Sequence, residues 1–413
     1  MRSELARRIA FTLGALLLFR LGTYIAVPGI NPAVWDQFMR AQDGSILGVF
    51  NVTSGGAVAR LSIFALGILP YVSAAVILQL VAYFSARLRR LQSSGESGRR
   101  RLETYTRIFT LAMALFQSAG IASALADIDH LVAAPGPLFL VSVTLTMTGG
   151  TMFLIWLSRQ ITLRGLGNGV ALILCTGVIF ELMSAVAMTN QLNRQGVVSG
   201  GFIGGLIGLT VVLAVVATLM EKARRRERVV FGADAGAGST RRESYLSLKL
   251  NGAGTIPALV AAWVMALPLI PAGFADPSDP GVWTEMAQTL GPGRPLYFLG
   301  YGIAVFVLVY LYTSFVLDPD ELAEKLKRHG GVIPQVEPGE ATAVHLDAVL
   351  SRTTLVGAIY LAAFCLFLAV VQTWLKVPFF LAGTSLLILI GTVLDLESQV
   401  RNLANTSLGG LRE

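Results

Sequence analysis

The chain has 413 residues, of which 54% are hydrophobic and 14% are charged, and it carries a net charge of +7. This charge content is too low and the apolar content too high for an ordinary soluble domain. Apolar stretches close to the roughly 20 residues that cross a bilayer recur from Ile9 to the neighbourhood of Leu396, and no soluble domain fits between them. The sequence therefore predicts a membrane protein with several spans.

The N-terminus has the basic start and apolar run of a signal peptide. The run continues through Arg20 and Tyr24 to Pro28 without a clear small-residue cleavage site, so we interpret it as a retained first span. Hydropathy predicts nine further spans. The predicted ranges are 9–27, 62–84, 104–126, 138–157, 168–189, 201–220, 251–271, 296–317, 353–371 and 378–397.

Lys and Arg are distributed unevenly between the predicted loops. If the N-terminus is cytoplasmic, 26 of the 32 basic residues lie in the two termini and the cytoplasmic loops. Arg20 lies within the first span. The five basic residues on the outer side are Arg40, Arg60, Arg194, Arg294 and Lys376. The positive-inside rule thus predicts that both termini are cytoplasmic, and the net charge needs no nucleic-acid partner.

Ten spans divide into two groups of five, at residues 1–192 and 193–413. Because five is odd, the second half must insert with the opposite orientation, and inverted repeats of this kind build a central path between the halves. The predicted fold is an all-α polytopic membrane protein of ten transmembrane helices in two inverted halves, which together form one channel domain.

The second span is irregular at its start. Gly55 and Gly56 precede a short apolar stretch that contains Arg60 and ends at Pro70, which predicts a short helix, a break and a longer helix. Broken backbone at membrane depth must be buried in protein or line a wet cavity, which favours a re-entrant segment. An outer loop followed by a proline-kinked helix fits the same residues equally well.

The sequence has no pattern of a catalytic, cofactor or metal site. The phosphate-loop, zinc-protease and serine-hydrolase motifs are absent, and the three histidines fall in predicted loops. Cys175 and Cys365 lie inside apolar spans, where small buried packing residues are expected and neither a disulfide nor a metal site follows. We therefore predict that the chain is not an enzyme and uses no cofactor.

Seven collinear stretches resemble the SecY family of protein translocase channels. They are RLGTYIAVPGINP at 20–32, SGGAVARLSIFALGILPYVSAAVILQL at 54–80, SGESGRRRLETYTR at 94–107, GTMFLIWLSRQITLRGLGNG at 150–169, SYLSLKLNGAGTIPA at 244–258, KRHGGVIPQVEPGEATAVHLDAVLSRTTLVGAIYL at 327–361 and VPFFLAGTSLLILIGTVLD at 377–395. The resemblance covers nearly the whole chain. It implies the pore-forming subunit that conducts unfolded secretory proteins across the bacterial cytoplasmic (inner) membrane and releases membrane helices into the lipid.

The resemblance also implies site residues. A narrow apolar collar would seal around a passing chain, and a re-entrant plug helix at about 55–66 would close it from outside. A lateral gate between spans two and three and spans seven and eight would have a weak polar seam. The implied pore ring is Ile68, Val72, Val170, Leu174, Leu259 and Phe367; the plug residues are Gly55, Gly56, Arg60 and Phe64; the gate residues are Ser73, Gln117 and Asn251. Each set is open to a second interpretation, as ordinary core, turn or helix-packing residues.

The loops at 221–249 and 318–352 resemble the platforms on which the family binds the SecA ATPase or the ribosome. The first has a Gly/Ala-rich tip, and the second has Glu337 where the family has an arginine. Expected partners are SecE, clamping the halves near 190–200, peripheral SecG, preproteins with signal sequences, and membrane lipid. The implied platform residues are Arg224, Arg225, Arg226, Arg241, Arg242, Glu337 and Gly339.

Two other classes compete with a channel. An ion-coupled secondary transporter also uses inverted repeats, but it needs buried ionisable residues along its path. Arg20 and Glu181 lie toward outer span ends, and Asp395 and Glu397 lie at a cytoplasmic end, so few candidates exist. An intramembrane protease would need a Ser/His pair or an acidic pair at membrane depth, and this sequence has neither.

Overall fold

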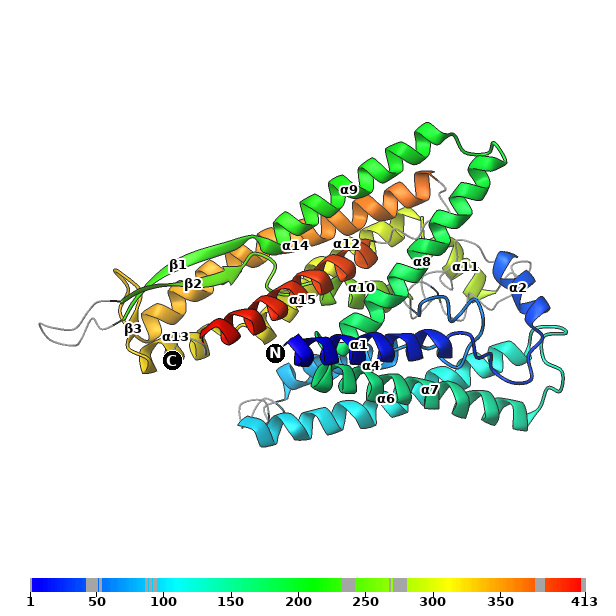
Figure 1. Cartoon of the computed structure of the whole chain (residues 1–413), viewed down its shortest axis with the longest axis horizontal. Coiled ribbons are helices and arrows are strands. Elements are labelled where there is room, and N and C mark those ends of the chain that lie inside the picture. Colours follow the sequence, from blue (N-terminus) through cyan, green and yellow to red (C-terminus); the bar gives the residue numbers. More distant parts are fainter. Residues whose placement is uncertain are drawn as a thin grey trace, which may run out of the picture.

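Figure 1 shows the computed structural model of the chain, which describes residues 2–41, 51, 54–85, 88, 91, 95–231, 242–266, 269, 281–375 and 383–409. A helix overlaps each of the ten predicted spans. These helices are α1 (Arg2–Gly22), α4 (Leu69–Phe84), α6 (Gly95–Ala126), α7 (Pro137–Arg164), α8 (Gly169–Arg194), α9 (Gly200–Lys222), α10 (Ile256–Ala266), α12 (Pro295–Val316), α14 (Glu340–Leu375) and α15 (Gly383–Gly409). Seven helices among the described residues are long and apolar enough to cross a membrane, so the prediction of a multi-pass membrane protein is confirmed.

Helix starts follow local sequence signals. Asn168 caps α8 by accepting hydrogen bonds from the backbone amides of Val170 and Ala171, and Ser199 caps α9 in the same way. Proline stands in the first turn of α4, α7 and α12, where its missing amide hydrogen costs no helical hydrogen bond. Polar caps and prolines thus set where the apolar runs become helices.

The cytoplasmic loops have their own structure, which hydropathy did not predict. Strands β1 (Arg224–Phe231) and β2 (Arg242–Lys249) form an antiparallel hairpin, and β3 (Gly331–Val332) pairs with β1 in the order β2-β1-β3. Beside this sheet lies the short helix α13 (Pro319–Arg328). Val229 of β1, Ala323 of α13 and Leu346 of α14 belong to one small apolar core, which joins the sheet and α13 to the first turns of α14. The hairpin projects from one end of the molecule, toward which both chain termini also lie (Figure 1).

Two further short helices lie at the opposite end, α2 (Pro32–Ala41) and α11 (Val282–Leu290). The main helix contacts fall into two groups. One contains α1, α4, α6, α7 and α8, and the other contains α9, α10, α12, α14 and α15. The groups meet where α8 contacts α15 and where α4 contacts α10 and α12. This arrangement is consistent with a boundary near residue 192, while the inverted relation of the halves stays a prediction.

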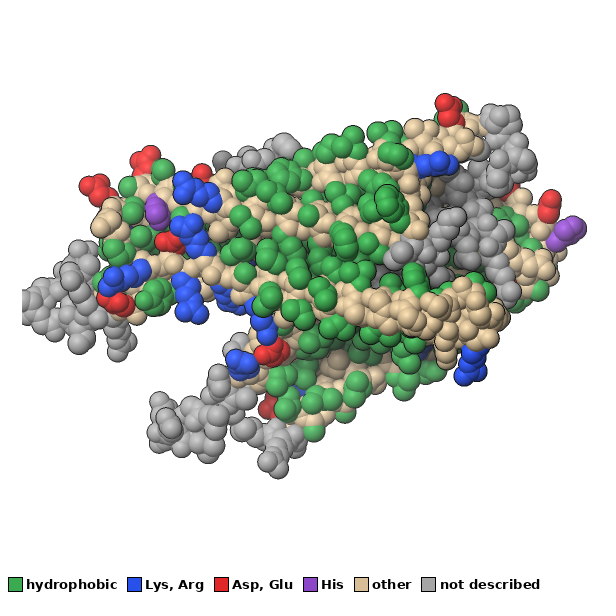
Figure 2. Space-filling view, turned by 90° about the horizontal axis from the view of Figure 1, so that it is seen from above, with side chains coloured by type: hydrophobic (Ala, Val, Ile, Leu, Met, Phe, Trp, Pro, Cys, Tyr) green, Lys and Arg blue, Asp and Glu red, His purple; other side chains and the backbone are tan. Residues whose placement is uncertain are grey.

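Apolar side chains dominate the middle of the molecule, and Lys and Arg gather toward the hairpin end (Figure 2). Much of the apolar band on this view comes from α9, whose Ile207, Val212 and Leu219 are exposed. Exposed apolar patches of this size are unusual on a soluble protein. A band of exposed aliphatic side chains flanked by charge is the surface that a bilayer requires.

Candidate functional site

An apolar collar joins the two helix groups at the centre of the structure. Ile68, at the start of α4, is 1% exposed, and Leu174 of α8 and Leu259 of α10 are each 5% exposed. They belong to one cluster of buried residues, against which Val72 and Val170 pack. Five of the six predicted ring residues therefore lie together, and they come from both helix groups.

Phe367 does not join this cluster in the structure. Its side chain on α14 is 46% exposed, whereas Phe364, Cys365 and Leu368 face the core of the C-terminal helices. Neighbouring residues on a helix point about 100° apart, so Phe367 does not share the face that packs Leu368 into the core of the C-terminal helices. The cluster instead contains Ile388 of α15, which is 6% exposed and which the sequence analysis missed.

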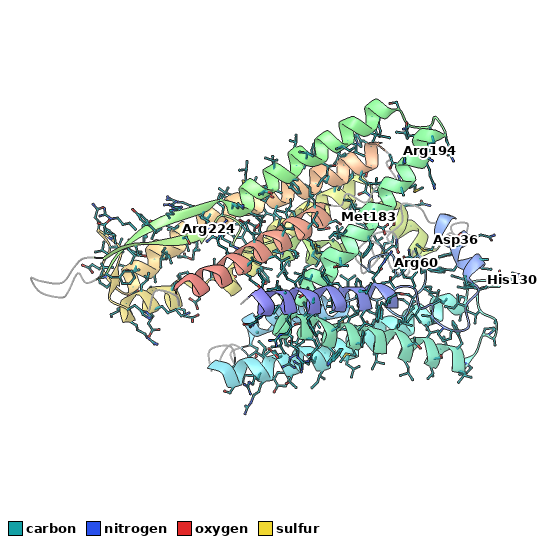
Figure 3. The ribbon with its side chains drawn as sticks, in the orientation of Figure 1. Asp36, Arg60, His130, Met183, Arg194 and Arg224 are labelled. Carbon is teal, nitrogen blue, oxygen red and sulfur yellow. The ribbon has the colours of Figure 1, made fainter. Side chains whose placement is uncertain are left out.

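A cavity of about 1040 Å³ lies directly against the collar. Its apolar lining includes Val72, Val170, Leu174, Leu259 and Ile388. Its charged lining comes from the ends of α9 and α15 and from the base of the hairpin. These charged residues are Glu221, Lys222, Arg224, Arg226, Lys249, Asp395, Glu397 and Arg401. Figure 3 places Arg224 at the hairpin base, so the charged part of the cavity lies toward the hairpin end.

The predicted plug segment is present, but its backbone forms consecutive turns rather than a short helix. Gly55, Gly56 and Gly67 have positive φ angles, and so does Leu61, at 43°. The carbonyl of Leu61 accepts a hydrogen bond from the amide of Val27, and the amide of Ile63 donates to the carbonyl of Ile25. Pairing with residues 25–27 thus takes up the backbone groups that a helix would use internally.

Close contacts fix the plug segment among α1, α7 and α8. The Phe64 ring stacks between the rings of Phe19 and Phe153, with centroids 6.1 and 5.9 Å away. A β-carbon at Gly150 of α7 would overlap the carbonyl oxygen of Ile63. Only glycine at this position permits such an approach of backbone to backbone.

A charged cluster surrounds the plug on the side away from the hairpin. The guanidinium of Arg20 donates to the carbonyl oxygen of Gly55 at 2.9 Å and lies 4.0 Å from the ring centroid of Phe180. Arg60 lies over the ring of Tyr24 at 4.4 Å and donates to the carbonyl of Gly56. Figure 3 shows Arg60 far from Arg224, so the predicted plug segment lies far from the base of the basic hairpin.

No hydrogen bond within the described residues links the three predicted gate residues to one another. Ser73 lies on α4 and Gln117 on α6, and the side-chain amide of Gln117 is buried without a hydrogen-bond partner among the described residues. Asn251 precedes α10 and donates to a carboxylate oxygen of Glu221 on α9 at 2.7 Å, so it bonds within the C-terminal helix group. Helix α4 belongs to one side of the predicted gate and contacts α10 and α12 of the other side, and the gate itself stays a prediction.

The predicted platform residues spread over the hairpin and the turn before α14. Arg224, Arg225 and Arg226 are exposed on β1, and Arg242 opens β2. Glu337 is exposed, and its carbonyl accepts a hydrogen bond from Thr342, while Gly339 has φ 114°. Arg241 and the Gly/Ala-rich tip lie outside the described residues.

Potential metal ligands do not gather at one place in the part of the chain that the structure describes. No group of three or more His, Cys, Asp or Glu side chains there has the geometry to hold a metal ion. Cys175 and Cys365 are both buried and free, as predicted for packing residues. The main assembled feature is the apolar collar, which lies between the charged cavity and the segment predicted to be the plug.

Among the described residues, ten helices pack in two groups that meet at an apolar cluster beside a cavity, an architecture that fits a multi-pass membrane channel. The SecY family model matches residues 62–396. The SecY subunit of the Escherichia coli K12 protein translocase is 40% identical over 412 residues, which cover 98% of this chain and 93% of that relative. The chain belongs to the SecY family.

Solved structures agree on the fold. One described as a protein conducting channel has a TM-score of 0.70 at 18% identity, covering 96% of this chain and 92% of that chain. The channel of a canine ribosome–channel complex from the endoplasmic reticulum has a TM-score of 0.69 at 16% identity, with the same coverages. This confirms the predicted fold class, and by family the chain is the pore-forming subunit of a protein translocase rather than an enzyme. An ion-coupled transporter is not supported.

Proposed function

We propose that unfolded polypeptides pass through the collar formed by Ile68, Val72, Val170, Leu174, Leu259 and Ile388. The observation that carries this proposal is that one buried apolar cluster is built from both helix groups at the end of an open cavity. A narrow apolar constriction disfavours a continuous water column and offers a passing chain no specific bonds. The collar thus suits cargo of any sequence, because it relies on fit and dewetting rather than on recognition.

The plug closes this path from the far side in the resting state. Most of its residues are buried, and Arg20 of α1 donates a hydrogen bond to the carbonyl of Gly55. A plug held by separate small contacts can leave as a unit when a signal sequence stabilises the open state. Lateral release of membrane helices would occur where α4 contacts α10 and α12.

Cross-linking a cargo arrested in transit tests the path. The purified complex would carry single cysteines at Leu259, Ile388 or Phe367, after replacement of Cys175 and Cys365, and an arrested preprotein would carry a cysteine in its mature part. We expect disulfides from positions 259 and 388 but not from 367. Cross-links from 367 alone would contradict the proposed path.

We further propose that the chain lies in the bacterial inner membrane with both termini and the hairpin in the cytoplasm. The uneven distribution of basic residues supports this orientation, and the two termini lie toward the hairpin end (Figure 1). Single cysteines at the exposed Tyr245 and Asp129 test it in intact cells. Labelling of position 129 but not 245 by an impermeant reagent is expected, and the reverse would overturn the orientation.

The hairpin and the turn before α14 form the platform that we propose for SecA or a ribosome. Relatives of this fold are known in ribosome-bound complexes from dog and yeast, and the exposed Arg224–Arg226 stretch offers cations to such a surface. SecE would brace the two helix groups near 190–200, and SecG would lie at the periphery. The negative charge of Glu337 repels an acidic or phosphate-bearing partner. Glu337→Arg should therefore strengthen binding of that partner about threefold at low salt, in a co-sedimentation assay, and less at high salt.

A further inference from the structure

One face of the hairpin lines the cavity, and the register of the strands shows which residues that face carries. Arg224 pairs with Lys249 and Arg226 pairs with Ser247, and all four residues line the cavity. Alternate residues of a strand point to opposite faces, so Arg224 and Arg226 share one face with the residues across from them. The hairpin base is therefore a wall of the cavity as well as part of the platform.

The opposite face of β1 contacts other residues of the protein. Arg225 forms an ion pair with Glu227 at 2.7 Å, and Glu227 lies 3.8 Å from the ring of His345 on α14. Arg228 shares the face of Arg224 and Arg226 but lies beyond the cavity, where it pairs with Glu243 across the hairpin, and Arg225 does not line the cavity either. The strand thus carries two cations toward the cavity and two cations that other residues neutralise.

The charge at the cavity mouth is positive. Five of its charged residues are basic and three are acidic. Glu397 pairs with both Lys222 and Arg401, whereas no ion pair within the described residues involves Arg224 or Arg226. A concave wall of one sign beside apolar walls focuses its field into the cavity. The two arginines therefore present their charge to whatever occupies the cavity.

We propose that Arg224 and Arg226 make the cavity mouth a charge filter, which admits acidic segments of a translocating polypeptide more readily than basic segments. This inference rests on the proposed path through the collar. Arginine suits the role, because it stays charged at any physiological pH and forms forked hydrogen bonds with carboxylates. A basic segment would meet like charges before it reaches the apolar collar, and it would dwell on the cytoplasmic side.

The test compares three preproteins that differ only in one internal segment of six Gln, six Glu or six Lys residues. Transport by the purified complex in proteoliposomes is measured as the rate of protease protection, and the readout is the Glu-to-Lys rate ratio. Arg224→Gln/Arg226→Gln should lower this ratio about three- to tenfold at low salt and less at high salt. Arg224→Glu/Arg226→Glu should lower it further.

The matched control is Arg225→Gln/Arg228→Gln, which removes the same charge from the same strand but not from the cavity wall. Its ratio should equal that of the wild type, even if partner docking changes the absolute rates. The proposal is overturned if the control shifts the ratio as much, if neither variant shifts it, or if the cavity variant slows all three cargoes alike. Failure of the wild type to transport the Gln cargo would instead refute the proposed function.

Discussion

Arg20 and Gly55 tie the first helix to the plug through a single forked contact. One guanidinium nitrogen of Arg20 donates to the Gly55 carbonyl at 2.9 Å, and the other donates to the Tyr24 hydroxyl at 2.8 Å. The same guanidinium lies over the ring of Phe180 on α8. The left-handed conformation of Gly55, with φ 69°, helps direct its carbonyl toward α1. This charged side chain therefore belongs to the seal and needs no role in ion coupling.

Arg20→Lys should loosen the plug while keeping the charge. Lysine lacks the planar fork, so it cannot hold Gly55 and Tyr24 together in this geometry. Loss of a hydrogen bond to a charged group costs about 1.5–3 kcal/mol, which corresponds to about tenfold or more in the population of the unseated plug. Ion current through the reconstituted complex should rise accordingly. Arg7→Lys, near the start of α1, serves as the control, and equal currents from both variants would refute the role of Arg20.

Gly150→Ala should unseat the plug by steric contact alone. Its β-carbon would overlap the backbone carbonyl of Ile63, which cannot rotate away as a side chain can, and the strain is about 1–3 kcal/mol. The adjacent Gly149 gives a matched control, because a β-carbon there meets no atom within 4 Å. We expect Gly150→Ala to increase protease cleavage within residues 54–67 and Gly149→Ala to leave it unchanged. Identical cleavage patterns would show that Ile63 has room to move.

Asn251→Leu should destabilise the C-terminal helix group rather than change gating. Asn251 is 2% exposed, and its amide donates to Glu221 and to the carbonyl of Gly254. Removing the Asn251 amide leaves the Glu221 carboxylate without that donor, which lowers the free energy of unfolding by about 1–3 kcal/mol. The melting temperature of the complex in detergent should fall, and the double variant Asn251→Leu/Glu221→Gln should recover part of the loss. An unchanged melting temperature together with a raised resting ion current would instead show that Asn251 acts in the gate.

Hydropathy predicted the helices well and their faces poorly. The ten apolar runs were found because length and composition alone define a span. The α14 helix, by contrast, is apolar around most of its circumference, so nothing in its pattern distinguishes Phe367 from its buried neighbours Phe364 and Leu368. Tertiary contacts decide the face. The same limit hid Ile388, whose neighbours on α15 are also apolar.

The conformations of the β1 strand and the plug segment were not predicted, for a different reason. The run RRRERVVF of β1 lacks the regular alternation of a half-buried strand, because its first five residues are all charged. The face that buries Val229 also carries Arg225 and Glu227, which pair with each other. The plug was predicted as a short helix from its apolar residues. Its conformation depends on pairing with residues 25–27, a long-range contact that no local pattern encodes.

Asparagine substitutions at Ile388 and Phe367 separate the collar in the structure from the ring that the sequence implied. Ile388 is buried in the collar, so Ile388→Asn places an amide where water otherwise has no partner, which lowers the barrier to wetting. Phe367 is 46% exposed and lies outside both the collar cluster and the cavity lining, so Phe367→Asn leaves the collar unchanged. We expect a higher resting ion current for Ile388→Asn and a wild-type current for Phe367→Asn, measured in planar bilayers at matched protein levels.

Cargo discrimination should change together with the current. A polar collar closes less tightly, so a signal sequence has to supply less free energy to populate the open state. Ile388→Asn should then export a preprotein with a defective signal sequence, and Phe367→Asn should not. If Ile388 were ordinary packing, Ile388→Asn would bury an unsatisfied amide, at a few kcal/mol, and would lower the amount of folded complex without any current. A reduced yield of Ile388→Asn without any ion current would therefore show that Ile388 is not part of the pore. An increased ion current for Phe367→Asn would show that Phe367 of α14 is the sixth residue of the ring.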